Sequence, residues 1–417
     1  MKKTRRSKKP RMEDLIPNPE RRAEVLKRMY NRDPVVGQDG IFTDLLQAMI
    51  DAALEGEMDA HLEQEKDFGE VNRRNGYNTK QLRSRVGPMQ VHTPRDRSGT
   101  HKPMLVGKWD RELSTGMDEV IISLYARGNS VEDVRSQLRE LYGVEVSAGT
   151  ISRITDRVLE EITTWQQRPL DPCYSIIYLD AIHYKIRQEG KVKTKAVYNA
   201  YGVTAHGQRD LLGMYLSESE GSRYWGLILE DIKRRGVEDV LFFCVDGLNG
   251  FKEVIEDVFP ASITQRCIVH MVRTSTRYVS YKDIKEVCSD LRKIYGSANR
   301  DQAAIALENF GQKWDEKYKE IRPKWEQNWE ELMAFMDYHP HIRRMIYTTN
   351  PVEALHRVMR KVTKSKGAWV SENALIKQLY LNLMTNKKSW QRKAFHWVKI
   401  QRELIDQFGD RYEKYIL

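Results

Sequence analysis

The chain has 417 residues, which at roughly 150 residues per domain predicts about three domains, each long enough to form its own core. Hydrophobic residues make up 40% and charged residues 31%, as is typical of a soluble globular chain with a highly charged surface. Lys and Arg outnumber Asp and Glu by 69 to 59, an excess that fits a polyanionic partner such as nucleic acid and, equally, an ordinary basic enzyme.

Two further features exclude secreted and membrane-spanning proteins. The cysteines Cys173, Cys244, Cys267 and Cys288 are too few and too scattered for a disulfide scaffold, so we expect a reducing cytoplasm. No apolar run reaches the roughly 18 residues needed to cross a bilayer. The basic start, MKKTRRSKKP, is followed by RMEDLIPNPERRAEV where a signal peptide would have an apolar core. We therefore expect a cytoplasmic protein without membrane contact.

The first forty residues predict little order. Residues 1–40 mix Lys, Arg, Pro and Asn without an apolar period, which predicts a disordered basic tail and linker. Ordered structure is expected to begin at Ile41, where IFTDLLQAMIDAALEGEMDAHL predicts an amphipathic helix that packs within the chain or against a second copy. Its apolar positions are Phe42, Leu45, Leu46, Met49, Ile50, Ala53 and Leu54.

The rest of residues 41–110 predicts a small basic β-rich segment. From Arg73 to Gly99 the chain is dense in Arg, Gly, Asn and Pro, with turns at Gly76 and Gly87 between short apolar runs. Arginines beside Tyr77 and turn residues suit contact with DNA phosphates or the minor groove, whereas a solvated basic hairpin is the alternative. The residues expected to contact DNA are Arg73, Arg74, Arg83 and Arg85.

Residues 111–170 predict a helix-turn-helix domain for DNA binding. A helical period up to Tyr125 is broken before Ser130, which is expected to cap a second helix, VEDVRSQLREL. Gly143 ends that helix, and Ser147 is expected to cap AGTISRITDRVLEEI, the recognition helix. Helical hairpins that do not bind DNA have the same pattern. The side chains expected to reach DNA are Thr150, Ser152, Arg153 and Asp156 or Arg157.

Two apolar runs each lead to an aspartate. SIIYLDAIHYKIR opens with a run suited to a strand buried on both faces, and Asp180 is expected at the end of that strand. DVLFFCVDG leads in the same way to Asp246. A carboxylate at the end of a buried strand is costly unless something binds it. Either aspartate alone is explained as a loop cap, but two matching strands favour a shared site.

The order of elements around these strands predicts the fold class. Residues 171–282 contain three strands, a helix, a strand, a helix and a strand, which is the order of a ribonuclease H-like α/β domain. Its first and fourth strands are adjacent, so Asp180 would lie beside Asp246. Residues 283–345 predict an α-helical insertion, and residues 346–417 predict further amphipathic helices. The tryptophans expected in the core of the insertion are Trp314, Trp325 and Trp329.

A third acidic residue follows the helical insertion. In YTTNPVEALHRVMRK, Asn350 is expected as a helix N-cap and Pro351 as the first helical residue, so Glu353 falls on the opening turn. N-x-x-E is also a capping box, and taken by itself Glu353 is better explained by a bond back to Asn350 than by catalysis.

Four segments of the chain together resemble bacterial transposases of the IS256 family, which are relatives of the eukaryotic Mutator-like elements. These segments occur in the family's order within a resemblance that runs from about Ile41 to Tyr415. The resemblance implies a DDE triad of Asp180, Asp246 and Glu353 on a ribonuclease H-like domain that an all-α insertion interrupts. The segments are LDAIHYKIR, FCVDGLNGFKEVIEDVFP, QRCIVHMVR and TTNPVEALHRVMRKVTKSKGAW.

The implied chemistry is phosphoryl transfer between DNA strands. Carboxylate oxygens suit two Mg²⁺ ions, for which Mn²⁺ can substitute, and no protein nucleophile is needed. The resemblance implies double-stranded DNA as partner (terminal inverted repeats and target), a homodimer on DNA, association with the bacterial nucleoid, and a copy-out and paste-in route through a circular intermediate. A non-catalytic DNA-binding regulator and a ribonuclease H-like nuclease that cuts without joining are the alternatives.

Other polar residues near the triad have weaker signals. Cys267 and His270 form a C-x-x-H pair, but a structural zinc needs four ligands and no second close pair of Cys or His is expected. The resemblance implies that this pair lies close to the active site, where we expect it to position DNA or Asp246. The helix after Glu353 is expected to guide the DNA backbone, with a solvated basic face as the alternative. Its basic residues are Arg357, Arg360, Lys361 and Lys364.

Overall fold

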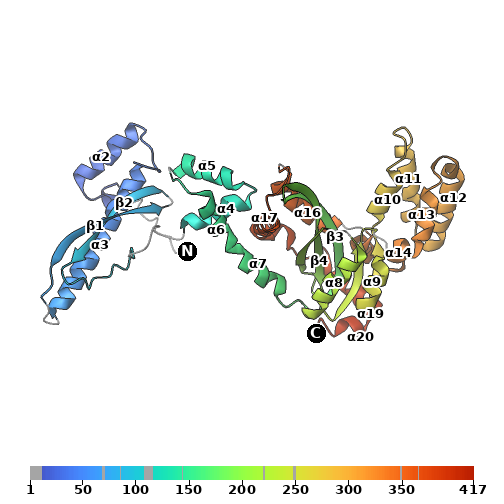
Figure 1. The fold of residues 1–417 in the computed structure, drawn as a ribbon. Coiled ribbons are helices and arrows are strands. Elements are labelled where there is room, and N and C mark those ends of the chain that lie inside the picture. Colours follow the sequence, from blue (N-terminus) through green and yellow to red (C-terminus); the bar gives the residue numbers. More distant parts are fainter. Residues whose placement is uncertain are drawn as a thin grey trace, which may run out of the picture. The chain divides into compact units, whose positions relative to one another are not determined.

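The computed structural model describes residues 12–67, 71–84, 86–107, 116–142, 144–218, 221–247, 250–347, 350–364 and 366–417. It divides between Arg157 and Val158 into two compact units, and each is described by itself. Figure 1 labels most of the helices and strands of both units. None of the described helices is both long and apolar enough to cross a membrane.

The first unit begins with two helices, α1 (Met12–Leu15) and α2 (Pro19–Tyr30). The expectation that order begins at Ile41 is therefore wrong. The Asn18 side chain accepts hydrogen bonds from the backbone N–H groups of Glu20 and Arg21 at 3.0 and 3.1 Å, and Pro19 takes the first helical position. This cap and the burial of Val25 stabilise a helix whose sequence has little apolar period. Residues 1–11 lie outside the described residues.

Helix α3 (Ile41–Asp67) packs on a hairpin formed by β1 (Arg74–Ser84) and β2 (Gly87–Asp96), which confirms the predicted helix and β-rich segment. Their shared core contains Ile50, Leu54, Leu82, Met89, Val91 and Val106. Phe42 and Met49 were predicted on the apolar face but are 46% and 69% exposed. They lie outside the buried face of α3 that contains Ile50 and Leu54.

Three further helices form a second core in this unit: α4 (Gly116–Ala126), α5 (Val131–Tyr142) and α6 (Ala148–Asp156). Both predicted caps are confirmed, because Ser130 Oγ accepts from Asp133 N and Ser147 Oγ accepts from Thr150 N, each at 3.1 Å. Gly143 lies outside the described part of the chain.

The single recognition helix predicted from Ala148 to Ile162 is wrong in its second half. Helix α6 ends at Asp156, and a separate helix, α7 (Val158–Gln167), begins in the second unit. The apolar residues on the two sides of this break pack on different partners. Ile151 and Ile154 lie in the core of α4, α5 and α6, whereas α7 contacts β5 and α17.

A five-stranded mixed sheet is the centre of the second unit. The strand order is β5-β4-β3-β6-β7, in which β3, β4 and β5 are antiparallel while β6 and β7 run parallel to β3. The predicted order of elements and the adjacency of β3 and β6 are confirmed. The elements are β3 (Cys173–Gln188), β4 (Lys191–Thr204), β5 (Arg209–Ser217), α8 (Ser222–Arg234), β6 (Asp239–Val245), α9 (Phe251–Val258) and β7 (Ile263–Arg266).

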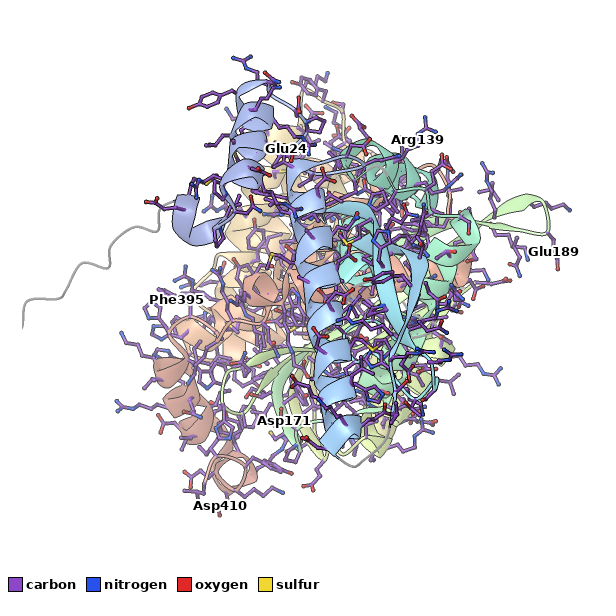
Figure 2. The ribbon with its side chains drawn as sticks, turned by 90° about the vertical axis from the view of Figure 1, so that its left-hand side faces the viewer. Glu24, Arg139, Asp171, Glu189, Phe395 and Asp410 are labelled. Atoms are coloured by element: carbon purple, nitrogen blue, oxygen red, sulfur yellow. The ribbon has the colours of Figure 1, made fainter. Side chains whose placement is uncertain are left out.

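Asp180 was expected at the end of its strand, but it lies inside β3. Every residue from Cys173 to Asp180 is buried, and beyond Ala181 buried and exposed residues alternate. The strand continues because β4 pairs with it as far as Gln188, whereas the parallel partner β6 ends at Val245. The resulting β3–β4 hairpin projects from the sheet with Glu189 at its tip, where Glu189 and Gly190 both have positive φ (Figure 2).

Helices cover both faces of the sheet. Residues of α8 and α9, including Trp225 and Ile255, pack in one cluster with Tyr198 and Phe243 of the strands. On the other face, Phe242 contacts the ring of Phe408 edge-on, with ring centroids 5.5 Å apart. The C-terminal helices are α16 (Asn350–Thr363), α17 (Glu372–Thr385), α18 (Lys387–Trp390), α19 (Trp397–Phe408) and α20 (Asp410–Glu413).

Between β7 and α16 the described chain is helical. Trp314 and Trp325 are buried, as predicted, and Trp329 is only partly buried. The helices are α10 (Ile268–Thr276), α11 (Ile284–Tyr295), α12 (Arg300–Tyr318), α13 (Ile321–Gln327), α14 (Trp329–Met333), the 3₁₀ helix η1 (Ala334–Asp337) and α15 (Pro340–Ile346).

A buried carboxylate joins two of these helices and gives a test of stability. Burial alone would raise the pKa of Asp290, but hydrogen bonds from Lys293, Lys313 and Trp314 outweigh burial and lower this pKa from 3.8 to about 2. The resulting stabilisation is present above pH 3.8 and is lost as the pH falls towards 2. Asp290→Asn is therefore expected to lower the free energy of unfolding by about 2 kcal/mol at neutral pH.

Urea unfolding of Asp290→Asn and wild type at neutral pH and at pH 3 measures this effect, with the exposed Asp257→Asn as the matched control. The difference between Asp290→Asn and wild type should shrink at the lower pH. An equal difference at both pH values would contradict the assignment of the effect to the Asp290 charge.

Candidate active site

Two of the predicted acidic residues lie on neighbouring strands at the same end of the sheet. The parallel register pairs Leu179 with Val245, so Asp180 and Asp246 are the next residues along β3 and after β6. Each carboxylate is oriented by the residue that follows it. The backbone N–H of Ala181 donates to Asp180 Oδ1, and that of Gly247 donates to Asp246 Oδ1, both at 2.8 Å.

Glu353 approaches these aspartates from α16. Its Oε1 lies 3.7 Å from Nε2 of His270 and 3.5 Å from Nη2 of Arg273, two residues of α10. One turn further along α16, His356 Nδ1 lies 3.6 Å from Asp180 Oδ2. The structure therefore brings Asp180, Asp246, Glu353 and His270 together.

The capping role of Glu353 stays a prediction. Helix α16 begins at Asn350, one residue earlier than expected. The side chain of Asn350 lies outside the described residues, so its bond to Glu353 is untested.

The chain that leads to α16 is attached to the same two strands. Tyr178 Oη donates to the carbonyl of Met345 at 2.7 Å, and Cys244 Sγ donates to the carbonyl of Ile346 at 3.3 Å. The backbone N–H of Ile268, at the start of α10, donates to the carbonyl of Tyr347 at 3.1 Å. These bonds hold the end of α15 against β3, β6 and α10, close to the position from which Glu353 enters the site.

Negative charge accumulates at this end of the sheet. Burial, together with the nearby charges of Asp246 and Glu353, raises the pKa of Asp180 to about 7, while the charge of His270 acts in the opposite direction. A side-chain hydrogen bond with Cys267, together with the charges of Asp180 and Asp246, raises the pKa of His270 to about 9. A divalent cation would relieve the repulsion between these carboxylates.

The donor set fits a divalent metal in ligand type. Three carboxylates offer the oxygen ligands that Mg²⁺ and Mn²⁺ prefer. The triad is nevertheless not a closed cluster. Among the described residues, the groups of metal-binding side chains whose ligand atoms all lie within 4.8 Å of one another are found elsewhere in the chain.

Asn199 and His356 were missed by the sequence predictions. Asn199 lies opposite Asp180 on β4, and its Nδ2 donates to the carbonyl of Val197 at 3.1 Å and to His356 Nε2 at 3.0 Å. Because Nε2 accepts, the ring proton of His356 is on Nδ1, the nitrogen that faces Asp180. Burial, with the charges of Arg360 and His270, lowers the pKa of His356 to about 3, so this ring is neutral.

Both residues left a signal in the sequence. Asn199 is a polar residue inside the apolar run AVYNAYGV, and His356 follows Glu353 by three residues and so shares its side of the helix. A single polar residue in a buried strand indicates a partner, but the sequence does not say which one.

A pocket of about 770 Å³ lies beside Asp246. Basic residues outnumber acidic ones in its lining, because Arg266, Arg277 and Lys324 accompany the single carboxylate of Asp246. The remaining lining residues are Gly247, His270, Met271, Thr274, Gln327 and Asn328. The pocket is thus a basic hollow with an acidic residue of the triad at its edge.

The basic residues of α16 lie on its exposed face. Arg357, Arg360 and Lys361 are exposed, as is Lys364 just beyond the helix. The apolar residues Val352, Leu355, Met359 and Val362 are buried. This division of the two faces is as predicted, and contact of the basic residues with DNA stays a prediction.

The predicted DNA contacts of the β1–β2 hairpin differ in their surroundings. Arg74 pairs with Glu55 and Asp59 of α3, so acidic neighbours balance its charge. Arg73 is exposed and Arg83 is partly exposed. Arg85 lies outside the described residues.

The predicted contacts of α6 lie in the same unit. Arg153 is exposed, and Thr150 and Ser152 are partly exposed. Arg157 Nη1 pairs with Asp118 Oδ2 at 2.6 Å.

Comparison with known proteins decides the family. The family model described as "Transposase, Mutator family" matches residues 20–393. The chain belongs to the Mutator family of transposases. This transposase is 41% identical over 394 residues to the transposase for insertion sequence element ISRM3 of Rhizobium meliloti (strain 1021), with 93% of this chain and 98% of that protein covered.

More distant relatives span a similar share of the chain. A probable transposase for an insertion sequence element of Corynebacterium diphtheriae is 37% identical to this transposase, with 78% of this chain and all of that protein covered. The transposase for IS256 in transposon Tn4001 of Staphylococcus aureus is 24% identical, with 83% of this chain and 90% of that protein covered. The resemblance to the IS256 family is therefore confirmed.

Proposed function

We propose that the chain is the transposase of an insertion sequence, which binds the terminal inverted repeats of its element and catalyses DNA strand cleavage and strand transfer by a DDE mechanism. The observation that carries this proposal is the meeting of Asp180 and Asp246, on adjacent parallel strands, with Glu353 of α16. Two aspartates and a glutamate delivered from separate elements support a metal-dependent phosphoryl-transfer site better than they support three independent caps.

In this proposal Asp180, Asp246 and Glu353 hold two Mg²⁺ ions, or Mn²⁺ in their place. When bound, the ions would lower the pKa of attacking water and offset negative charge on the phosphate and the leaving oxygen. The backbone N–H groups of Ala181 and Gly247 orient the two aspartates. His270 and Arg273, beside Glu353, provide positive charge for a DNA phosphate.

The sheet is proposed to be of ribonuclease H-like type, with β3 at its centre, three antiparallel strands and two parallel ones. The helical residues 283–345 are proposed as the insertion between the second Asp and the Glu. Residues 41–110 and, of residues 111–170, those up to Arg157 in the first unit are proposed as DNA-binding segments. The exposed Phe42 and Met49, seven residues apart on one side of α3, support that helix as a contact of a homodimer on DNA.

The basic pocket beside Asp246 is proposed to hold the DNA backbone. Arg277, which directly follows α10, and Lys324 of α13 are exposed and line the pocket. Each lost phosphate contact reduces the salt dependence of DNA affinity by about 0.9 in the slope of log K against log salt. Arg277→Ala combined with Lys324→Ala is therefore expected to reduce this slope by about 2.

Affinity for a DNA fragment with the element end, measured at several salt concentrations, checks this prediction. The matched control combines Arg223→Ala with Lys388→Ala, two exposed basic residues of α8 and α18. A slope that is unchanged in the pocket variant, or reduced equally in the control, would remove the pocket from the DNA path.

Strand transfer in solution tests the function as a whole. The purified chain, Mg²⁺, a DNA fragment with the inverted repeats that flank its coding region, and a target plasmid are expected to yield a joined product. Cleavage without joining would favour the nuclease, and binding without cleavage would favour the regulator. A circular junction between the two element ends is the product expected of the copy-out and paste-in route.

A further inference from the structure

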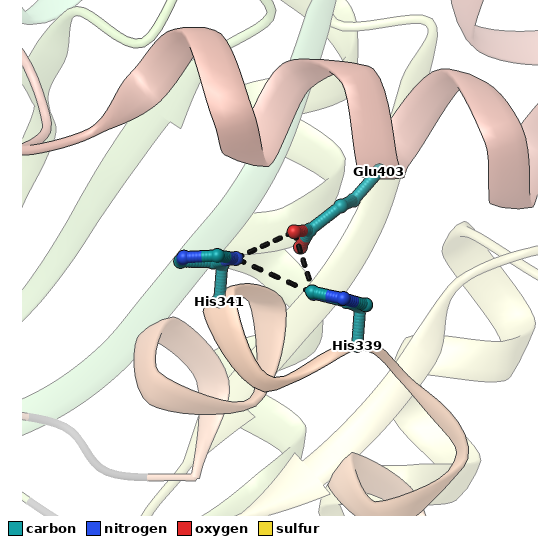
Figure 3. A group of neighbouring side chains, drawn as sticks. All are labelled: His339, His341 and Glu403. Carbon is teal, nitrogen blue, oxygen red and sulfur yellow. Dashed lines mark hydrogen bonds and ion pairs between the residues drawn. The ribbon is translucent and has the colours of Figure 1, made fainter.

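His339, His341 and Glu403 form a cluster that has no part in the proposed chemistry (Figure 3). His339 precedes α15 and His341 lies in its first turn, while Glu403 comes from the middle of α19. Oε1 of Glu403 lies 2.5 Å from Nδ1 of His339 and 2.6 Å from Nδ1 of His341. The two Nδ1 atoms are 3.3 Å apart. Two ring nitrogens and one carboxylate oxygen therefore lie within 3.3 Å of one another.

The spacing of the two imidazole nitrogens suits a transition metal. Zinc bonds of about 2.0–2.1 Å in tetrahedral geometry place two ligand atoms about 3.3 Å apart. His341 Nδ1 forms a hydrogen bond with Glu403 Oε1, and His339 Nδ1 lies at ion-pair distance from the same oxygen, so the side chains are assembled before any ion binds. Nitrogen with carboxylate oxygen is a common ligand set for Zn²⁺, whereas Mg²⁺ prefers oxygen alone.

The carboxylate of Glu403 is incompletely satisfied by its neighbours. Both rings converge on Oε1, whereas Oε2 is buried and has no hydrogen-bond partner among the described residues. Among the residues that the structure describes, the two histidines are the only ion-pair partners of Glu403. A buried carboxylate oxygen without a partner is costly, and a bound cation would offset that cost.

The local sequence fixes the two histidines in place. Pro340 separates them and takes the first position of α15, which holds His339 in an extended conformation with φ −61° and ψ 147°. The imidazole rings consequently lie nearly parallel, at an interplanar angle of 15° with centroids 5.3 Å apart. The expectation that no second close pair of Cys or His exists is wrong, because H-P-H is such a pair.

We propose that His339 Nδ1, His341 Nδ1 and the Glu403 carboxylate bind one Zn²⁺ ion, with water as the fourth ligand. The ion fastens the start of α15 to α19. The far end of α15 is already held by Tyr178 and Cys244, so the metal fixes the other end of the helix that leads to α16. The site is structural, and it is separate from the carboxylates proposed to hold Mg²⁺.

Metal content of the full-length protein tests the proposal. The background is Asp180→Asn with Glu353→Gln, which removes two proposed ligands of the other site. After EDTA treatment and dialysis against Zn²⁺, mass spectrometry is expected to find one zinc per chain, and Co²⁺ is expected to give the visible absorption of a tetrahedral site. Adding His339→Ala and His341→Ala should weaken zinc binding by about 100-fold or more, since even indirect partners of a metal contribute 10–100-fold.

Two further variants separate a metal site from a hydrogen-bonded cluster. Glu403→Gln keeps an oxygen acceptor for the imidazoles but lacks the charge, so it should fold normally and lose the zinc. Cys267→Ser with His270→Ala is the control for the other Cys and His pair and should retain one zinc. No stoichiometric zinc in the background protein, or equal zinc affinity with and without His339 and His341, would overturn the proposal.

Discussion

Asp180→Asn, Asp246→Asn and Glu353→Gln are each expected to reduce strand cleavage and strand transfer by about 10³-fold or more, while affinity for the element ends stays at the wild-type level. Each change removes one negatively charged ligand from the proposed metal site. Metal-assisted stabilisation of a phosphoryl-transfer transition state is worth several kcal/mol, and about 4 kcal/mol corresponds to about 10³ in rate. DNA binding is spared because it depends on basic residues, which these three variants leave unchanged.

The glutamate variant also separates the two roles considered for Glu353. Gln serves in a capping box as well as Glu does, so Glu353→Gln would retain a cap and lose only the charge. If Glu353 is solely a cap, the variant should be fully active and as stable as wild type. If Glu353 is a metal ligand, activity should fall without a change in thermal stability.

Single-turnover cleavage of a labelled element end in Mg²⁺ measures the effect, with end binding measured in Ca²⁺. Asp257→Asn and Glu230→Gln are matched controls, because both residues are exposed and lie on the helices α9 and α8 of the same unit. Wild-type strand transfer by any of the three active-site variants would exclude that residue from the triad.

The position of the two aspartates follows from apolar period and chain order. The buried start of β3 and the whole of β6 are nearly continuous apolar runs, as expected for strands covered on both faces. The order of elements predicted that the first and fourth strands are adjacent, and for this reason the sequence alone placed Asp180 beside Asp246. Local period and the order of elements were enough for this part of the fold.

Features that depend on contacts between distant residues were not predictable in the same way. Helix α2 has little apolar period in its sequence, and the hydrogen bonds that the Asn18 side chain accepts from its first backbone N–H groups stabilise it instead. The break at Arg157 falls within a continuous helical pattern, because the residues before and after it pack on different partners. A pattern describes which residues are buried, but it does not identify the surface that buries them.

The environment of Asp180 is a further case of this kind. Asn199 and His356 are 157 positions apart in the chain and form one hydrogen-bonded pair beside this carboxylate. The sequence predicted Glu353 on the opening turn of its helix, but it gave no reason to expect a contact between His356, one turn later, and β4. The register of β3 and β4 explains this contact, because it places Asn199 opposite Asp180.

We expect His356 to position Asp180, so that His356→Ala slows strand cleavage by about 10²-fold. Nδ1 of the neutral ring lies 3.6 Å from Asp180 Oδ2, and Asn199 fixes the orientation of the ring. Without the ring, Asp180 Oδ2 would lose this neighbour, and the carboxylate would be oriented through Oδ1 by the backbone N–H of Ala181. A displacement of about 1 Å in a catalytic group can cost about 10² in rate.

Rescue by a conservative variant distinguishes positioning from general destabilisation. The amide nitrogen of asparagine takes the place of Nδ1, so His356→Asn should recover most of the cleavage rate, although asparagine has no atom in place of Nε2 and loses the contact with Asn199. Both variants are expected to lose some thermal stability, because His356 is 3% exposed and either change leaves a cavity. The cleavage rate at saturating DNA is therefore compared with the melting temperature of each variant, and the exposed His206→Ala is the control. Equal rates for His356→Ala and His356→Asn would assign the loss to packing. A cleavage rate that recovers in His356→Asn without a matching recovery of the melting temperature would assign the loss to the Nδ1 proton that faces Asp180.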